Sequence, residues 1–431
     1  MIYQALYIIE LILLCYLGFN VLYVSVFSIA GSFFTRTDFR AIKVEKYNRF
    51  VILIPAFKSD EVILNTVGHA LNQNYPTEKF DVIVIADSLK QLTIGELLVM
   101  PIKLIPVQFE VSTKAKSLNT ALGLLPDNAY DYCVVLDVDN IMEQDFLRKI
   151  NARLQNDELV VQGHRTAKNL DSAFAILDGI SEEINNHIFR RGHIAFGLSS
   201  ALSGSGQSIN YKFFKEAMFN IHSPVEDKEL EFYLVKNNIK VLFEEDALIY
   251  DEKVQNSAVF MKQRKRWVAS QFFDFNSVLL EGIANLVLHG NFDFFDKALQ
   301  RILMPRVLLL GISFFMSLTV ITPIFHFGPL FFAMFILVAF SYLIAIPSHF
   351  FNSNTFFAAL RVPQAFLLML LAMFRSKGAA KVFNHTQHTT VVGAKIVGSA
   401  QDYQENQKQI NLSKQQGEIL TLNSNSNENR N

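Results

Sequence analysis

The sequence has few cysteines and almost no net charge, and each shortage excludes a class of protein. Its 431 residues carry 39 basic and 40 acidic side chains, a formal net charge of −1. A nucleic-acid-binding protein needs a basic surface to neutralise phosphates, so no nucleic acid is expected as a partner. Neither Cys15 nor Cys133 lies in a Cys-x-x-Cys motif or a cluster with zinc-ligand spacing. We therefore predict neither a disulfide-bonded scaffold nor a structural zinc site.

Apolar residues are distributed unevenly along the chain. They make up 51% of it, slightly above the roughly 45–50% of soluble proteins, while charged residues, at 18%, fall below the usual ~25%. These totals do not decide the class of protein. However, apolar side chains and many of the 40 phenylalanines gather toward the two ends, around a middle of ordinary globular composition. This pattern predicts membrane-anchored ends around a water-soluble domain.

The N-terminal region is predicted to cross a bilayer. Between residues 5 and 34 the only strongly polar side chains are Glu10 and Asn20, and this run exceeds the ~20 residues that a spanning helix needs. A cleaved signal peptide is not expected, because no basic residue precedes Arg36. Five basic residues follow the span: Arg36, Arg40, Lys43, Lys46 and Arg49. By the positive-inside rule, they place the middle of the chain in the cytoplasm and the N-terminus outside the cell membrane.

Apolar segments return toward the C-terminus. Residues 272–288 mix aromatic, aliphatic and acidic side chains, which is typical of a helix lying at a membrane surface. Residues 302–325 and 330–346 are each apolar enough to span, and their short link predicts a hairpin. Residues 356–374 contain an arginine and a proline, and basic residues follow them. For this segment we favour an interfacial or re-entrant path over a true crossing, so the protein is predicted to be multi-pass.

The middle of the chain has the pattern of an α/β domain. Short β-rich runs alternate with helical patterns, which predicts a mostly parallel sheet covered by helices. The expected strands are residues 50–54, 82–86, 102–107 and 132–136. Asp60 is expected to cap the first helix. Asp87 and Asp137 follow two of the strands directly, and ligands bind at the carboxyl ends of strands in such sheets.

Asp137 and Asp139 form a candidate metal site. Alternate residues at a strand end point the same way, so the two carboxylates converge while Val138 points into the core. Hard oxygen ligands suit Mg²⁺ or Mn²⁺, which takes its other ligands from water and a substrate diphosphate. A motif this short also arises by chance as a solvated turn.

Three further groups have a chemical and an ordinary interpretation. Asp87 could contact a ligand or merely form a turn. Lys114 and Lys116 could meet phosphate or simply face water. Adjacent Glu226 and Asp227 make a good helix start, and one of them could serve as a general base. The sequence does not choose between these two acids.

The segment from Gln263 to Trp267 is the last candidate. On a helix, Gln263, Arg266 and Trp267 share one face, while Arg264 and Lys265 point elsewhere. That face offers an amide, a guanidinium suited to phosphate and the only Trp in the chain, whose indole can support a sugar ring. A basic amphipathic segment resting on anionic lipid is the alternative.

In this order, these elements resemble the membrane-bound family-2 glycosyltransferases, the group that includes cellulose, chitin and hyaluronan synthases. The resemblance covers about residues 49–270. The residues that carry it are Pro55-Ala56-Phe57, Asp87, Asp137-Val138-Asp139, Glu226-Asp227 and Gln263 to Trp267. It implies a GT-A-type domain on the cytoplasmic face that transfers a sugar with inversion from a nucleotide sugar, expected to be a UDP-sugar.

The resemblance also implies a role for each matched residue. Asp227 would be the catalytic base, and Asp137 and Asp139 would hold Mg²⁺ or Mn²⁺. The donor would be bound by Asp87, Lys114, Asn119, Asp137 and Asp139. The acceptor and the diphosphate would be bound by Glu226, Gln263, Arg266, Trp267, Gly204 and Gly206.

The sequence departs from the family pattern at four places. Lys58-Ser59 stands where Asn-Glu is usual, Ser88 follows Asp87 in place of an acid or glycine, and Thr113 replaces a glycine before Lys114. Val225 replaces the Thr of Thr-Glu-Asp. Because the metal, base and tryptophan motifs are intact, we expect an active enzyme.

Three functions follow from these observations. The first is sugar addition to a growing polysaccharide at the membrane. The second is transfer of a single sugar to a lipid or lipid-linked acceptor, which the small number of predicted spans favours, unless an export partner or a second copy of the chain completes a channel. The third is a catalytically silent membrane scaffold, motivated by the departures at Lys58, Thr113 and Val225.

The expected organisation has six segments. They are a transmembrane helix (1–35), a cytoplasmic GT-A-type domain (36–260), the Gln-x-x-Arg-Trp and interfacial helices (261–300), a transmembrane hairpin plus a third apolar segment (301–375), a cytoplasmic segment (376–399) and a disordered polar tail (400–431). His385 and His388 lie three apart in the fifth segment. Since no third ligand is evident nearby, we expect a surface segment rather than a metal site there.

Overall fold

A mixed eight-stranded sheet forms the centre of the protein. The computed structural model describes residues 2–36, 38–156, 158–223, 225–271, 275–322 and 324–375. The strand order is β3-β2-β1-β4-β7-β6-β8-β5. These strands are β1 (Phe50–Phe57), β2 (Phe80–Asp87), β3 (Lys103–Val107), β4 (Tyr132–Val135), β5 (Ile141–Met142), β6 (Val160–Ala167), β7 (Gln207–Asn210) and β8 (Val241–Asp251). The α/β prediction is thus confirmed.

Two short strands make the sheet mixed. β7 runs antiparallel to both β4 and β6, and β5 runs antiparallel to β8. The other neighbouring pairs are parallel. The carboxyl ends of β1, β2 and β4 therefore meet at one edge, as expected.

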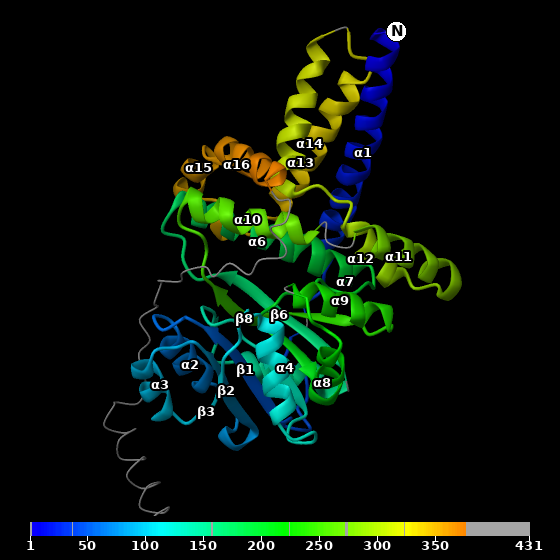
Figure 1. Ribbon diagram of the computed structural model, residues 1–431. Coiled ribbons are helices and arrows are strands. Elements are labelled where there is room, and N and C mark those ends of the chain that lie inside the picture. Colours follow the sequence, from blue (N-terminus) through cyan, green and yellow to red (C-terminus); the bar gives the residue numbers. More distant parts are fainter. Residues whose placement is uncertain are drawn as a thin grey trace, which may run out of the picture.

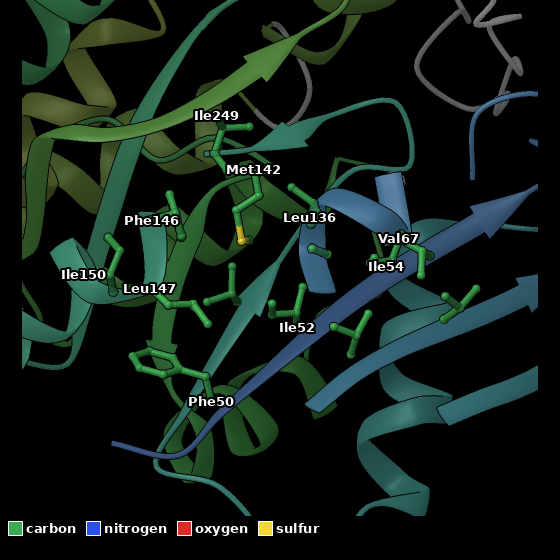
Figure 2. Packing of buried hydrophobic residues seen from close by; sticks show 14 of the residues in the cluster. Phe50, Ile52, Ile54, Val67, Leu136, Met142, Phe146, Leu147, Ile150 and Ile249 are labelled. Atoms are coloured by element: carbon green, nitrogen blue, oxygen red, sulfur yellow. The ribbon is translucent and has the colours of Figure 1, made fainter. Parts of the chain in front are cut away.

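The core lies on both faces of the sheet. Along β1, Phe50, Ile52 and Ile54 join one buried cluster, whereas Val51 and Leu53 join the other. Figure 2 shows the first cluster, in which side chains of β1 meet others from α5 and β8. A strand buried on both faces needs a continuous apolar run rather than alternation, which explains the sequence of β1.

Helices cover the sheet and connect its strands. Those of the sheet domain are α2 (Ile63–Leu71), η1 (Thr77–Lys79), α3 (Gln91–Leu98), α4 (Lys114–Leu124), α5 (Phe146–Arg153), η2 (Leu154–Asn156), α6 (Ala173–Asn185), the π-helical η3 (Asn186–Gly192), α7 (His193–Ala195), α8 (Tyr211–Phe219) and α9 (Glu226–Lys236). The remaining helices are α1 (Ile2–Gly31), α10 (Ser257–Gln271), α11 (Phe275–His289), α12 (Phe292–Gln300), α13 (Arg306–Ser317), η4 (Leu318–Ile321), α14 (Gly328–Ala345), η5 (Ser348–Phe350), α15 (Ser353–Ala359) and α16 (Val362–Phe374).

An apolar helical bundle rises from the sheet domain. Figure 1 shows α1, α13 and α14 side by side, with α6, α10, α15 and α16 lying between them and the sheet. Among the described residues, α1 and α14 are long and apolar enough to cross a membrane, and α15 with α16, bent by 46°, would make a third span if the pair counts as one. These helices are candidate spans, and the orientation of the chain remains a prediction.

Glu10 and Asn20 of α1 bind backbone N–H groups just before each of the two hairpin helices, α13 and α14. Asn20 Oδ1 accepts a hydrogen bond from the Met304 N–H (2.7 Å), just before α13. The Glu10 carboxylate accepts from the N–H groups of His326 (3.1 Å) and Phe327 (2.8 Å), just before α14. Glu10 and Asn20 are therefore buried and satisfied inside an otherwise apolar helix.

Two predictions for the start of the sheet domain were wrong. β1 continues through Pro55 to Phe57, because β4 has already left its side and a residue without an N–H is tolerated there. Asp60 does not cap α2; its carboxylate accepts from the Lys90 N–H (2.8 Å) and the Thr93 hydroxyl (2.7 Å) at the start of α3.

The first helix of the predicted hairpin is also shorter than expected. α13 starts after Pro305 and, with η4, ends at Ile321, too short to count among the candidate spans. Residues 272–274 of the expected interfacial helix lie outside the described part of the chain. So do the segments 376–399 and 400–431, with His385 and His388.

Candidate functional site

One large cavity gathers most of the predicted site residues. It has a volume of about 1920 Å³ and opens at the carboxyl ends of β1, β2 and β4. The predicted residues on its wall are Asp87, Lys114, Asp137, Asp139, Gly204, Glu226, Asp227, Gln263, Arg266 and Trp267. They come from segments that are far apart in the sequence, so the fold alone brings them together.

Asp87 ends β2 with part of its carboxylate unpaired. The side chain is buried, and its Oδ1 accepts from the Ser88 hydroxyl (2.9 Å). Its Oδ2 has no hydrogen-bond partner. Ser88 has a φ of +57°, the left-handed conformation that favours glycine. The free oxygen can accept an N–H or O–H from a ligand in the cavity.

Lys114 joins Asp137, after β4, to Glu226 at the start of α9. Its ammonium lies 2.5 Å from Asp137 Oδ1, 2.5 Å from the Gly204 carbonyl oxygen and 3.4 Å from Glu226 Oε1. Burial alone lowers the pKa of Lys114, but the carboxylates of Asp137 and Glu226 outweigh it, so this pKa is raised. Thr113, which replaces a glycine, caps α4 by accepting from the Lys116 N–H (3.2 Å) and so fixes the start of the helix that bears Lys114.

The segment from Gly204 to Gly206 supports Asp137 and Lys114. The Ser205 hydroxyl accepts from the Asp137 N–H (3.0 Å) and therefore holds the end of β4 in place. At Gly204, a Cβ would lie 3.0 Å from Lys114 Nζ. The lack of a side chain at Gly204 lets the ammonium reach the backbone.

The adjacent acids at the start of α9 differ in environment. Glu226 is buried, and burial raises the pKa of its carboxyl to about 7; Lys114 opposes this rise, whereas Asp227 and Asp137 add to it. Asp227 is partly exposed on the cavity wall and accepts the Lys228 N–H (2.9 Å) through Oδ1. Both acids line the cavity, and Asp227 is the more exposed of the two.

α10 presents its functional face to the cavity. Gln263, Arg266 and Trp267 all lie on the wall, and the Gln263 side-chain oxygen is buried with no hydrogen-bond partner. Arg264 differs from the prediction, because it also lies on the wall, pairs with Asp178 of α6 and stacks 4.1 Å from the centre of the Trp267 ring. The buried Arg264–Asp178 pair therefore fixes the indole.

A charged network that reaches the cavity wall was missed from the sequence. Arg165 pairs with Asp251 (2.6 Å), which also binds Lys253 (2.8 Å). Burial would raise the pKa of nearby Glu182, but Lys253 and Arg165 lower it to about 2. Asp251 ends β8 just as Asp87 ends β2, so the same strand-end signal could have found it.

Two predicted residues do not line the cavity. The Asn119 side chain donates to the Ile221 carbonyl oxygen (3.1 Å), which ties α4 to the loop before α9. Gly206 has a φ of +73°, and its N–H donates to the Val135 carbonyl oxygen (2.9 Å). In this structure both residues support the wall from behind, and their predicted contacts with substrate remain untested.

The sequence and the structure were compared with known proteins. No curated protein is significantly similar to the sequence. The structure is similar to the mannosyltransferase PcManGT from Pyrobaculum calidifontis, solved with GDP-Man and Mn²⁺ (14% identity, TM-score 0.46, 78% of this chain and 98% of that one). It is also similar to residues 1–349 of S. aureus TarS, solved with UDP-GlcNAc (15% identity, TM-score 0.39, 77% and 91%). A family model described as "Glycosyltransferase like family 2" matches residues 48–270, more than half of the sequence, and the chain therefore belongs to this family.

Proposed function

We propose that the protein is an inverting glycosyltransferase that moves a sugar from a nucleotide sugar to an acceptor hydroxyl at a membrane. The observation that carries this proposal is the convergence of Asp87, Asp137, Asp139, Asp227 and Trp267 on one cavity. A UDP-sugar is the expected donor, with the free Asp87 oxygen accepting a base N–H or a ribose hydroxyl.

Asp227 is proposed as the general base. It takes the proton of the acceptor hydroxyl as that oxygen attacks the anomeric carbon, and the bond from that carbon to the diphosphate breaks on the opposite face. The buried Glu226 and Lys114 hold the start of α9 against the metal motif. Arg266 meets the departing diphosphate, and the Trp267 indole supports the acceptor sugar.

The residues present fit a divalent cation. Asp137 and Asp139 offer hard carboxylate oxygens on the cavity wall, and within the described residues no group of three or more His, Cys, Asp or Glu forms a closed metal site. Two carboxylates suit an Mg²⁺ or Mn²⁺ ion that takes its remaining ligands from a diphosphate and water. When bound, this ion would stabilise negative charge on the leaving group.

Two acceptors are consistent with this chemistry. The family resemblance supports a growing polysaccharide, with an export partner or a second copy of the chain to complete a channel. The small number of candidate spans supports a lipid or lipid-linked acceptor. Size analysis of the products separates them, because a polymerase makes a ladder and a single transfer makes one discrete glycolipid.

Asp227→Asn tests the proposed reaction. We expect a loss of transfer of about 10²–10⁴-fold, because the proton of the hydroxyl has no acceptor, while binding of the donor is retained. The assay supplies membranes and purified protein with labelled UDP-glucose, UDP-GlcNAc or GDP-mannose, with Mg²⁺, with Mn²⁺ or with chelator. The control is Glu216→Gln on the exposed surface of α8, which should keep full activity. An unimpaired Asp227→Asn variant would favour the silent scaffold.

A further inference from the structure

The cavity continues beyond the catalytic residues into the helical bundle. Its wall includes Leu310 and Phe314 of α13, Phe335 and Ala339 of α14, and Phe366 and Met369 of α16. We call this part the apolar arm. It is bounded in part by α14, one of the two described helices long enough to cross a membrane.

The face of α13 changes character along its length. Arg306, Leu310 and Phe314 are spaced four residues apart and all line the cavity, so they form one stripe. Arg306 begins the stripe, and its guanidinium donates to Asn185 Oδ1 (2.8 Å) and Ser181 Oγ (3.0 Å) of the catalytic side. The stripe runs about 12 Å along the helix from Arg306 to Phe314, and its two side chains after Arg306 are apolar. Along α13 the cavity wall is thus polar at the catalytic end and apolar farther into the bundle.

Trp267, the proposed platform for the acceptor sugar, lies where the catalytic end of the cavity meets the apolar arm. Val268, the residue after Trp267, is buried in a cluster with Leu308 of α13 and Met369 of α16. A sugar on the indole is therefore next to the opening of the apolar arm. A molecule that reacts at Asp227 and continues into this arm meets first polar and then apolar groups.

Size and chemistry indicate what fills the arm. Pockets for drug-sized ligands span about 300–1,000 Å³, so the cavity holds more than a nucleotide sugar. A polysaccharide in the arm would leave its hydroxyl groups without hydrogen-bond partners, which costs free energy at each group. An alkyl or prenyl chain has no such groups and gains from contact with Leu, Phe and Met side chains.

We propose that the acceptor is an amphiphilic lipid whose hydroxyl-bearing head group reaches Asp227 while its hydrocarbon tail lies in the apolar arm. The proposal rests on the proposed function and chooses between its two acceptors. The tail enters from the bilayer side of α13, α14 and α16. The products are a glycolipid, the free nucleoside diphosphate and one proton taken from the head group.

Trp267 allows a test that does not depend on activity. It is the only Trp of the chain, so its fluorescence reports on this cavity alone. The probe is a maltoside with a dibrominated undecanoyl tail, compared with the same maltoside without bromine. We expect strong quenching in the wild type and several-fold weaker quenching in Ala339→Phe, which fills the arm. The matched control is Ala333→Phe, an exposed position of α14 away from the cavity, which should be quenched like the wild type.

A second pair of variants avoids overpacking. Phe314→Ser makes the wall polar at a side chain that is already 42% exposed, and it should weaken quenching. Phe332→Ser, at a 47% exposed position of α14 outside the cavity, should not. Equal quenching in Ala339→Phe, Phe314→Ser and the wild type would overturn the proposal.

Transfer assays separate this proposal from the proposed function. Alkyl glycosides with eight- and twelve-carbon tails are compared with the same free sugars as acceptors. We expect KM to fall at least tenfold with tail length in the wild type and to lose this dependence in Ala339→Phe. Efficient elongation of free oligosaccharides would overturn the lipid acceptor while supporting glycosyl transfer. Quenching without transfer to any acceptor would instead contradict the proposed function.

Discussion

At the scale of single residues, strand ends were the most informative signal. A parallel strand delivers the residue after it to a fixed edge, so Asp87 and Asp137 could be placed at the same edge of the sheet from sequence, although β1 separates their strands. The bridge that Lys114 makes to Asp137 and Glu226 could not be predicted, because it depends on how α4 and α9 pack against the sheet. The partners of a long side chain depend on the three-dimensional fold.

One buried acid away from the cavity makes stability depend on pH. Glu244 of β8 is buried, which raises the pKa of its carboxyl to about 7, against 4.5 for an ordinary glutamate. Between these values the unfolded chain ionises while the folded one stays protonated, so stability falls as pH rises from about 4.5 to 7. We expect Glu244→Gln to stabilise the protein by about 1–3 kcal/mol at pH 8 and to have little effect at pH 4.

Thermal melts in detergent at the two pH values measure this difference. Glu216→Gln on exposed α8 is the control and should leave the melting temperature unchanged at both. A stabilisation by Glu244→Gln that is equal at pH 4 and pH 8 would contradict the assignment.

At the scale of elements, long apolar runs were found and short polar ones were missed. β1 and β2 are buried on both faces, and continuous apolar runs in the sequence predict them. β7 reads Gln-Ser-Ile-Asn and has no such run; it forms because it fills the gap between β4 and β6. The length of α13 was overestimated from the sequence, because an apolar composition does not reveal where a helix ends.

Close packing of α1 on η3 depends on glycine. A Cβ on Gly192 would lie 2.2 Å from the carbonyl oxygen of Phe27 in α1, which is an impossible contact. We expect Gly192→Ala to force the two helices apart and destabilise the protein by about 1–3 kcal/mol. A melting temperature lowered by several degrees is the measurement.

Gly123→Ala provides the comparison for that variant. Gly123 also lies in a helix, α4, but nothing stands within 4 Å of its would-be Cβ. Alanine there should be neutral or slightly stabilising. Equal effects of the two substitutions would show that helix propensity, rather than the contact with α1, decides the outcome.

At the scale of the whole molecule, the uneven distribution of apolar residues predicted membrane-anchored ends around a water-soluble domain. The proposed orientation is open to a labelling experiment. In a Cys15→Ser background, Tyr3→Cys should react with a membrane-impermeant maleimide in intact cells, because the N-terminus is predicted to face outward. Lys43→Cys, which follows the C-terminal end of α1, should react only after the cells are opened. Cys133 is buried and should not react with the maleimide.

The reverse labelling pattern would invert the proposed topology. Labelling at both positions in intact cells would show that α1 does not cross the membrane. Both cysteines lie at exposed positions, with side-chain exposure of 86% at Lys43 and residue exposure of 75% at Tyr3, so access within the fold does not limit either reaction.

The hydrogen bonds of Glu10 and Asn20 also bear on the order of assembly during synthesis. Their backbone partners follow them by 316 and 284 residues. At about 5–20 residues per second, α1 leaves the ribosome roughly 15–60 seconds before the chain that satisfies it. The sheet domain is synthesised in that interval, tethered to a helix whose two polar groups still lack these partners. Docking of the α13–α14 hairpin is therefore a late step of biogenesis, and α15 and α16, which follow it in the chain, complete the cavity wall.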